Sequence, residues 1–393
     1  MAAETARQFQ ALEAQAQAIM GAFAKAGYEP VAPALIQPAG VFLDVVGEAL
    51  RARTYVFTDP DGAELCLRPD ITVPACRLYL ERHPKADAKA RYCYNGPAFR
   101  FQPAGAGAAH PREFRQAGVE FFGETAKEKA DAEVLAVVLA SVKAAGLDKV
   151  KLRIGDVGLF EALLAATDMP DRWRRRLRHR FWRPAAFRAE LQRLATAPGE
   201  QTRRLPADLQ TMLDPSNRRG TERAVTRYLE TNNIDLVGVR SVSEIVDRLL
   251  EGVEDARTSP LSRDTVELID NYLKVTAPAR AAGARLRDLM GSRGIDIGAA
   301  LDSYHRRLEK IAATGIDLAS VEFAAEFGLR IEYYTGFVFE LVVPDRLPPE
   351  SPIAGGGRYD GLLKAVGAPR DVPAVGAAIH TERLLAIVAG QMS

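Results

Sequence analysis

The sequence has few of the residues that usually hold metals or form disulfides. Only three of its 393 residues are cysteines, and Cys66, Cys76 and Cys93 form no CxxC pair. The five histidines show no HxxxH or HExxH spacing. We therefore expect a reducing compartment, no disulfide framework, and neither a metal site nor a cofactor.

An excess of one charge and long apolar runs are missing as well. The 52 Lys and Arg residues nearly balance the 51 Asp and Glu residues, giving a net charge of +1. No overall field then favours a nucleic-acid or membrane partner. No stretch approaches the roughly 18 apolar residues of a membrane span, and Glu4 and Glu13 interrupt the N-terminal segment where a signal peptide would be apolar. These absences predict a cytoplasmic protein with no membrane partner.

The residues that are present predict an α+β protein with a helical insertion. The composition, 47% hydrophobic and 26% charged, supplies a core for two domains. Helix- and strand-like segments fill residues 1–168, and strand-like text returns near residue 320. Residues 169–290 are Arg-rich and helical. We expect one core built from 1–168 and 291–393, interrupted by an insertion over 169–290.

Local signals place several elements along the chain. Helical spacing of apolar residues predicts a helix over 4–26, and Ser241 with Glu244 forms a capping box that starts another. The turn at Asp59-Pro-Asp-Gly62 predicts a hairpin. Further expected elements are helices over 71–82 and 128–145 and strands over 91–102, 112–123 and 149–155.

One expected strand carries an unusual polar face. In residues 113–123, Gln116 and Glu120 share a face and flank Gly118. This pattern could leave a gap for a small cationic or amine-bearing ligand. On the sequence pattern alone, however, we favour a half-exposed strand with a glycine at a bulge. Arg100 could likewise bind a phosphate or carboxylate, but in isolation an arginine on the protein surface is the favoured interpretation.

Two further segments could have a function in ligand or partner binding. The glycine-rich residues 354–361 match neither a P-loop nor a dinucleotide-binding fingerprint, and a tight turn explains them equally well. Residues 172–183 contain seven arginines and two tryptophans. We favour a charged helix face with Trp173, Leu177 and Phe181 buried, and a protein partner is the second reading.

Six segments stand out, in this order along the chain: GYEPVAPALIQPAGVFLDVVGE (27–48), LRPDIT (67–72), GPAFRFQPAG with HPREFRQAGVEFFG (96–123), IEYYTGFVFE (331–340), AGGGRYDGL (354–362) and VGAAIHTERL (375–384). Together they resemble the catalytic domain of histidyl-tRNA synthetases, which belong to class II. This resemblance implies an antiparallel sheet flanked by helices, and dimerisation through the first segment.

The resemblance also implies two sets of site residues. The first would bind histidine: Asp70, Thr72, Gln116, Glu120, Tyr333 and Tyr334. The second would be what remains of a phosphate or nucleotide pocket: Arg100, Arg112 and Arg383.

Departures from the synthetase pattern argue against adenylation. Leu329 stands where the family has the arginine that assists this step, and Arg330 lies one position along, on the opposite face of a strand. Losing such a group costs about 3–4 kcal/mol of transition-state stabilisation. Ile71 and His380 replace two glycines of the family pattern, and His380 would crowd the wall where adenine lies. We also expect no anticodon-binding domain after the third motif.

These departures resemble the non-catalytic relatives that serve ATP phosphoribosyltransferase as regulatory subunits. The resemblance implies a short-form catalytic subunit as partner, a dimer within a hetero-octamer, and histidine as feedback effector, while tRNA is not expected as a ligand. It leaves open whether histidine binds the pocket or a subunit interface. The alternatives are a histidyl-tRNA synthetase lacking its anticodon domain, a free-standing amide-forming relative, and a scaffold without ligand.

Overall fold

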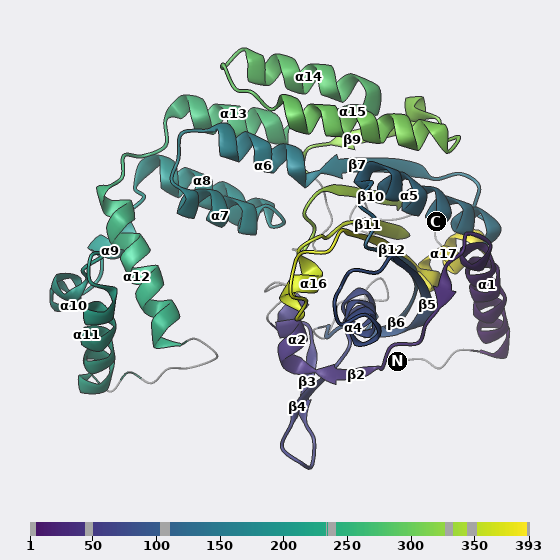
Figure 1. Cartoon of the computed structure of the whole chain (residues 1–393), viewed down its shortest axis with the longest axis horizontal. Helices are drawn as coiled ribbons and strands as arrows, with labels where there is room; N and C mark the ends of the chain where they lie inside the picture. Colours follow the sequence, from purple (N-terminus) through teal and green to yellow (C-terminus); the bar gives the residue numbers. More distant parts are fainter. Residues whose placement is uncertain are drawn as a thin grey trace. The chain divides into compact units, whose positions relative to one another are not determined.

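The chain folds into two compact units. A computed structural model describes residues 5–43, 50–102, 111–232, 234, 241–326, 333–343 and 352–390 (Figure 1). Unit 1 contains residues 1–166 and 272–393, and unit 2 contains residues 167–271. Within the described residues, no helix is both long enough and apolar enough to span a membrane.

Unit 1 is built on a large sheet. Neighbouring strands are antiparallel except for the pairs β1–β5 and β7–β9, which are parallel. Among the described residues the sheet has nine strands, in the spatial order β1 (Glu29–Pro30), β5 (Ala90–Phe99), β6 (Glu113–Phe122), β12 (Ala374–His380), β11 (Ala354–Arg358), β10 (Phe337–Val342), β7 (Lys151–Asp156), β9 (Val321–Ala324) and β8 (Thr276–Pro278).

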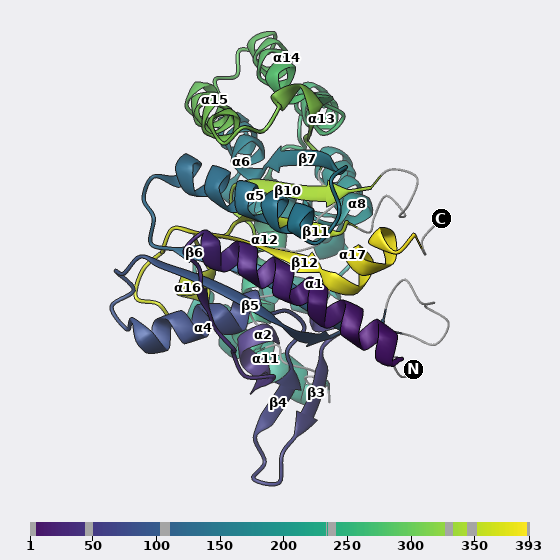
Figure 2. The same cartoon turned by 90° about the vertical axis from the view of Figure 1, so that its right-hand side faces the viewer.

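Helices cover one face of this sheet (Figure 2). On β6, Arg115 pairs with Glu13 of α1, and on β10 the ring of Phe337 lies under Arg307 of α15. Helix α5 packs against both α1 and α15. The helices of unit 1 are α1 (Ala6–Lys25), α2 (Ala39–Leu43), α4 (Thr72–Arg82), α5 (Lys127–Ala144), α6 (Val157–Ala166), α14 (Ala279–Gly291), α15 (Gly298–Ala313), the 3-10 turn η1 (Leu318–Ser320), α16 (Leu362–Ala365) and α17 (Thr381–Val388).

The opposite face of the sheet, which we call the pocket face, carries α4. The ring of Tyr79 on α4 lies 4.7 Å from that of Phe122 on β6, and Phe122 points to the same face as Glu120 because side chains alternate along a strand. A smaller sheet, β2 (Ile36–Pro38), β4 (Glu64–Leu67) and β3 (Tyr55–Thr58), includes the predicted hairpin. Its turn is fixed by Asp59, whose carboxylate accepts from the backbone N–H of Ala63.

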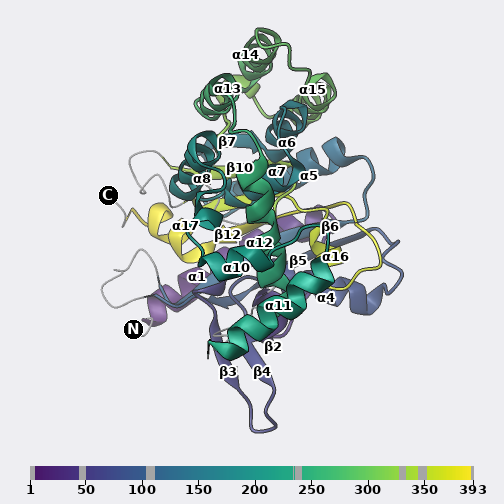
Figure 3. The same ribbon diagram turned by 90° about the vertical axis from the view of Figure 1, so that its left-hand side faces the viewer.

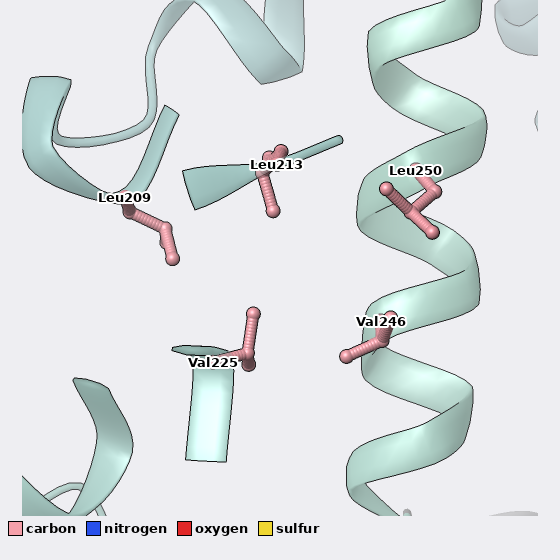
Figure 4. Close-up of a cluster of buried hydrophobic side chains, with 5 residues drawn as sticks. All are labelled: Leu209, Leu213, Val225, Val246 and Leu250. Carbon is pink, nitrogen blue, oxygen red and sulfur yellow. The ribbon is translucent and has the colours of Figure 1, made fainter. Parts of the chain in front are cut away.

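Unit 2 is helical and has its own hydrophobic core (Figures 3 and 4). The predicted capping box starts α12, since Ser241 and Glu244 exchange hydrogen bonds. The helices are α7 (Asp171–Arg180), α8 (Pro184–Thr196), α9 (Glu200–Arg203), α10 (Ala207–Met212), α11 (Arg218–Thr231), α12 (Val242–Arg257) and most of α13 (Arg263–Leu273). The core side chains in Figure 4 are Leu209, Leu213, Val225, Val246 and Leu250.

The Arg-rich segment forms α7 and is held from inside unit 2. Trp173, Leu177 and Phe181 are buried as predicted. Asp255 of α12, 1% exposed, accepts from Arg172 Nε at 2.7 Å, Trp173 Nε1 at 2.6 Å and, through its second oxygen, Arg176 Nη1 at 2.7 Å. Arginines of this segment therefore neutralise a buried acid of their own domain.

The second boundary of the insertion differs from the predicted one. Unit 2 ends at residue 271, whereas the sequence placed the end of the insertion at 290. The reason is β8: its three residues pair with β9 and so extend the large sheet, and α14 packs against both strands. A three-residue strand inside Arg-rich helical text carries little period-2 signal.

Candidate functional site

The pocket face is shaped by β6 and by glycines on its neighbours. Gln116 and Glu120 share this face, as predicted, and Glu120 lies opposite Gly376 of β12. Its carboxylate lies across that glycine, because a Cβ at 376 would be 1.6 Å from Glu120 Oε2. Small residues thus let an acid lie flat on the sheet.

The gap predicted beside Gly118 is filled. Tyr94 of β5 lies directly opposite Gly118, and its hydroxyl would be 2.5 Å from a Cβ placed there. The ligand space is therefore not at Gly118 itself, and that expectation is corrected. Tyr94 instead presents its hydroxyl to Glu120.

Glu120 is a fully buried carboxylate surrounded by hydroxyl groups. Tyr94 Oη donates to its Oε1 at 2.9 Å, Tyr359 Oη donates to Oε2, and the Thr72 hydroxyl also hydrogen-bonds to it. Burial, with a smaller contribution from the nearby Asp70, raises the pKa of Glu120 to about 7, and the hydroxyls of Tyr359, Thr72 and Tyr94 oppose this shift. The carboxyl group thus titrates in the range of an imidazole.

Two buried oxygen acceptors near Glu120, on Asp70 and Gln116, lack a hydrogen-bond partner among the described residues. Asp70 Oδ1 accepts from the Val73 backbone N–H at 3.2 Å, but Asp70 Oδ2 and Gln116 Oε1 have no hydrogen bond. Burial raises the pKa of Asp70, while Val73 N–H, Arg100 and Arg68 oppose this shift. Because buried acceptors are nearly always satisfied in proteins, these two oxygens indicate a ligand with N–H donors.

Aromatic rings lie near Asp70 and Glu120. Tyr333 lies 5.0 Å from Tyr334 and 5.7 Å from Tyr359, measured between ring centroids, and its hydroxyl hydrogen-bonds with Thr72. Tyr334 packs on Gly357, where a Cβ would be 3.0 Å from its ring. Both residues precede β10, which begins at Phe337.

A cationic cluster lies near the end of β5. Arg100 lies over Phe114, 4.9 Å from the ring centroid, and donates to the Pro69 carbonyl at 3.0 Å. Burial lowers the pKa of Arg100 to about 10, although Asp70 opposes this shift, and the positive charges of Arg53 and Arg383 add to it. Partly buried guanidinium groups near one another favour an anion.

His380 lies in this cationic cluster. Its ring is 5.5 Å from that of Phe114, and burial together with Arg383 and Arg100 lowers its pKa. An uncharged imidazole thus takes up space where the synthetase pattern has glycine. Ile71, which also replaces a glycine of that pattern, is 1% exposed.

The structure therefore brings most of the predicted residues together. Asp70, Thr72, Gln116, Glu120, Tyr333 and Tyr334 are all buried on the pocket face. Arg112 is the exception, since its exposed side chain contacts Gln102 and Phe101 among the described residues. Leu329 and Arg330 lie outside the described residues.

Two site residues were missed by the sequence analysis, Tyr94 and Tyr359. Tyr94 could have been found only from the pairing of β5 with β6, because Gly118 lies opposite it and makes room for its ring. Tyr359 stood inside the AGGGRYDGL match but was assigned no role.

Comparison with known proteins first defines the class. The histidyl-tRNA synthetase family model matches residues 4–267 and 249–384. A solved structure described as an ATP phosphoribosyltransferase regulatory subunit/histidyl-tRNA synthetase, from Bacillus halodurans, has a TM-score of 0.66 at 24% identity, covering 99% of this chain and 82% of that one. The fold is that of histidyl-tRNA synthetases, an α+β architecture with a helix-flanked, mainly antiparallel sheet, as predicted.

Curated relatives narrow the class to one kind of protein. An ATP phosphoribosyltransferase regulatory subunit of Mesorhizobium japonicum is 33% identical over 93% of this chain and 95% of its own length. Another, of Brucella anthropi, is 34% identical over 90% and 92%. The chain belongs to the family of ATP phosphoribosyltransferase regulatory subunits.

Proposed function

We propose that this chain is a non-catalytic regulatory subunit that binds free histidine in the pocket and transmits its feedback signal to a short-form ATP phosphoribosyltransferase. The observation that carries the proposal is the pair of unsatisfied buried acceptors, Asp70 Oδ2 and Gln116 Oε1, beside the carboxyl group of Glu120. A ligand with both an ammonium group and an imidazole supplies the missing donors.

Each part of histidine has a partner of matching chemistry. Asp70 and Gln116 would accept from the α-ammonium group. Glu120, with a pKa of about 7, is matched to imidazole and would share a proton with it. The guanidinium groups of Arg100 and Arg383 would attract the α-carboxylate or another small anion.

The pocket residues argue against adenylation. His380 lies against Phe114, and the branched side chain of Ile71 is buried; both replace glycines of the synthetase pattern and would hinder a nucleotide. The reaction would belong to the partner, a glycosyltransferase of the first step of histidine biosynthesis. We infer a dimer of this chain within a hetero-octamer, no role for tRNA, and a reducing cytoplasmic setting that fits the three free cysteines.

Regulation then requires that histidine bind one state of the complex more tightly than another. By linkage, the catalytic subunit's active state must weaken histidine binding by the same factor. A histidine site that lies wholly in unit 1 can meet this requirement if an element that contacts the site differs in position between the two states.

The test mixes the chain with a short-form catalytic subunit and measures the rate with and without histidine. We expect Glu120→Ala to assemble normally but to need 10- to 100-fold more histidine for half-inhibition, because a charge-assisted hydrogen bond is worth about 1.5–3 kcal/mol. Glu322→Ala, on the same sheet but ion-paired to Lys151, serves as control. Unchanged inhibition in Glu120→Ala contradicts the proposal, as does robust histidine-dependent ATP–pyrophosphate exchange by the chain alone.

A further inference from the structure

Arg358 joins the pocket face to the helical layer behind the sheet. Its side chain is 4% exposed. Nε and Nη2 donate to Asp131 Oδ1 at 3.0 and 2.6 Å, Nη1 donates to Asp360 Oδ1 at 2.8 Å, and Nη2 also donates to the Lys127 carbonyl at 3.0 Å. The guanidinium group thereby fixes the end of β11 against α5.

Asp360 fixes the chain on the other side of Tyr359. Its Oδ1 accepts from the Ala374 backbone N–H at 3.0 Å, and its Oδ2 accepts from Lys127 Nζ at 2.7 Å. Its own N–H donates to Thr335 Oγ1 at 3.1 Å, and Thr335 N–H donates to the Arg358 carbonyl at 2.7 Å. The same few bonds therefore hold both Tyr359 and the segment that carries Tyr333 and Tyr334.

We propose that Arg358 and Asp360 are positioning residues: they hold the Tyr359 hydroxyl on Glu120 and so set the affinity and pH dependence of amino-acid binding. Neither side chain touches the pocket acids in any bond described above. Their effect passes through Tyr359, which lies between them in the chain. This inference rests on the proposed histidine site.

The direction of the effect follows from the hydrogen bond. Tyr359 donates to Glu120 and lowers its pKa, against the effect of burial. When the hydroxyl is displaced, the carboxyl group ionises only at higher pH. The other groups that face Glu120 are Asp70, Thr72, Cys76, Tyr94, Tyr333 and Tyr334, and none of them is substituted in the variants.

The experiment measures L-histidine binding to the full chain by calorimetry between pH 5.5 and 8.5. Variants are Arg358→Lys, Asp360→Asn and Tyr359→Phe, with Arg153→Lys as matched control. Arg153 is also a sheet arginine paired with a buried carboxylate, Glu340, 2.6 Å away. We expect roughly 5- to 20-fold weaker binding at pH 7, about the loss of one hydrogen bond, and a binding midpoint displaced to higher pH in the three variants, with the control unchanged.

A double variant separates positioning from general destabilisation. Because Arg358 acts through Tyr359, Arg358→Lys should add little to Tyr359→Phe. Additive losses, or a loss of equal size at every pH, would overturn the inference, as would wild-type binding in a folded Arg358→Lys protein. If the wild-type chain binds no histidine at all, the proposed function itself fails, and this outcome is distinct. If Arg358→Lys does not fold, the Asp360→Asn and Tyr359→Phe pair decides in the same way.

Discussion

At the scale of the residue, the burial of the Glu120 carboxyl group should reduce the stability of the fold at high pH. A buried carboxyl group whose partners are neutral hydroxyls keeps its proton up to a pKa of about 7 in the folded chain, compared with about 4.3 when unfolded. Between these two values the folded state binds more protons than the unfolded state. Stability from this group is therefore present at low pH and is lost as pH rises through 7.

Replacing this acid by its amide should reveal the effect. Without ligand, Glu120→Gln is expected to be nearly neutral at pH 5 and to raise the free energy of unfolding at pH 8 by up to about 3 kcal/mol. Denaturant unfolding at the two pH values checks this. Comparing variant with wild type at each pH removes the titration of other groups. A variant that is less stable than wild type at pH 8 would contradict this prediction, because it would show that ionised Glu120 does not lower the free energy of unfolding.

Single residues also mark the limit of what the sequence could predict. Alternation along one strand correctly placed Gln116 and Glu120 on a common face. It could not show that Tyr94 fills the space at Gly118, because this depends on the register between two strands separated by a loop. The resemblance identified Asp70 and Tyr333, which no periodicity would join to β6.

At the scale of the element, short strands and buried ion pairs were the hardest features to predict. Helix α12 begins directly after the predicted capping box, and α5 begins within a residue of the predicted position. By contrast, β8 belongs to the sheet only through its pairing with β9. The roles of the arginines on α7 depend on Asp255, more than 70 residues away in the chain.

The packing of α7 against α12 should depend on this one acid. Asp255→Ala leaves Arg172, Trp173 and Arg176 without their shared acceptor and is expected to destabilise unit 2 by about 3–5 kcal/mol. Arg175→Ala, which removes an exposed pair with Glu251, should change stability by less than about 1 kcal/mol. Thermal unfolding followed by circular dichroism compares the two. Similar losses in both variants would rule out a special role for the buried carboxylate.

At the scale of the whole molecule, the pocket and the helical insertion belong to different compact units. The chain passes between them twice, near residues 166 and 271. Every described member of the proposed histidine site lies in unit 1, and the cluster of Figure 4 lies wholly in unit 2. Each unit thus has its own hydrophobic interior, which is the condition for separate unfolding transitions.

Calorimetry of the full chain should therefore resolve two transitions that respond to different changes. If histidine binds folded unit 1 as proposed, at 100 times its dissociation constant it should stabilise that unit by about 2.7 kcal/mol and leave the other transition in place. Asp255→Ala should do the reverse, lowering the transition of unit 2 alone. A single transition that moves as a whole with histidine would mean that the two units unfold together. The insertion would then be part of the cooperative structure that senses the ligand, and its α7–α12 ion pairs would become candidates for the regulatory coupling.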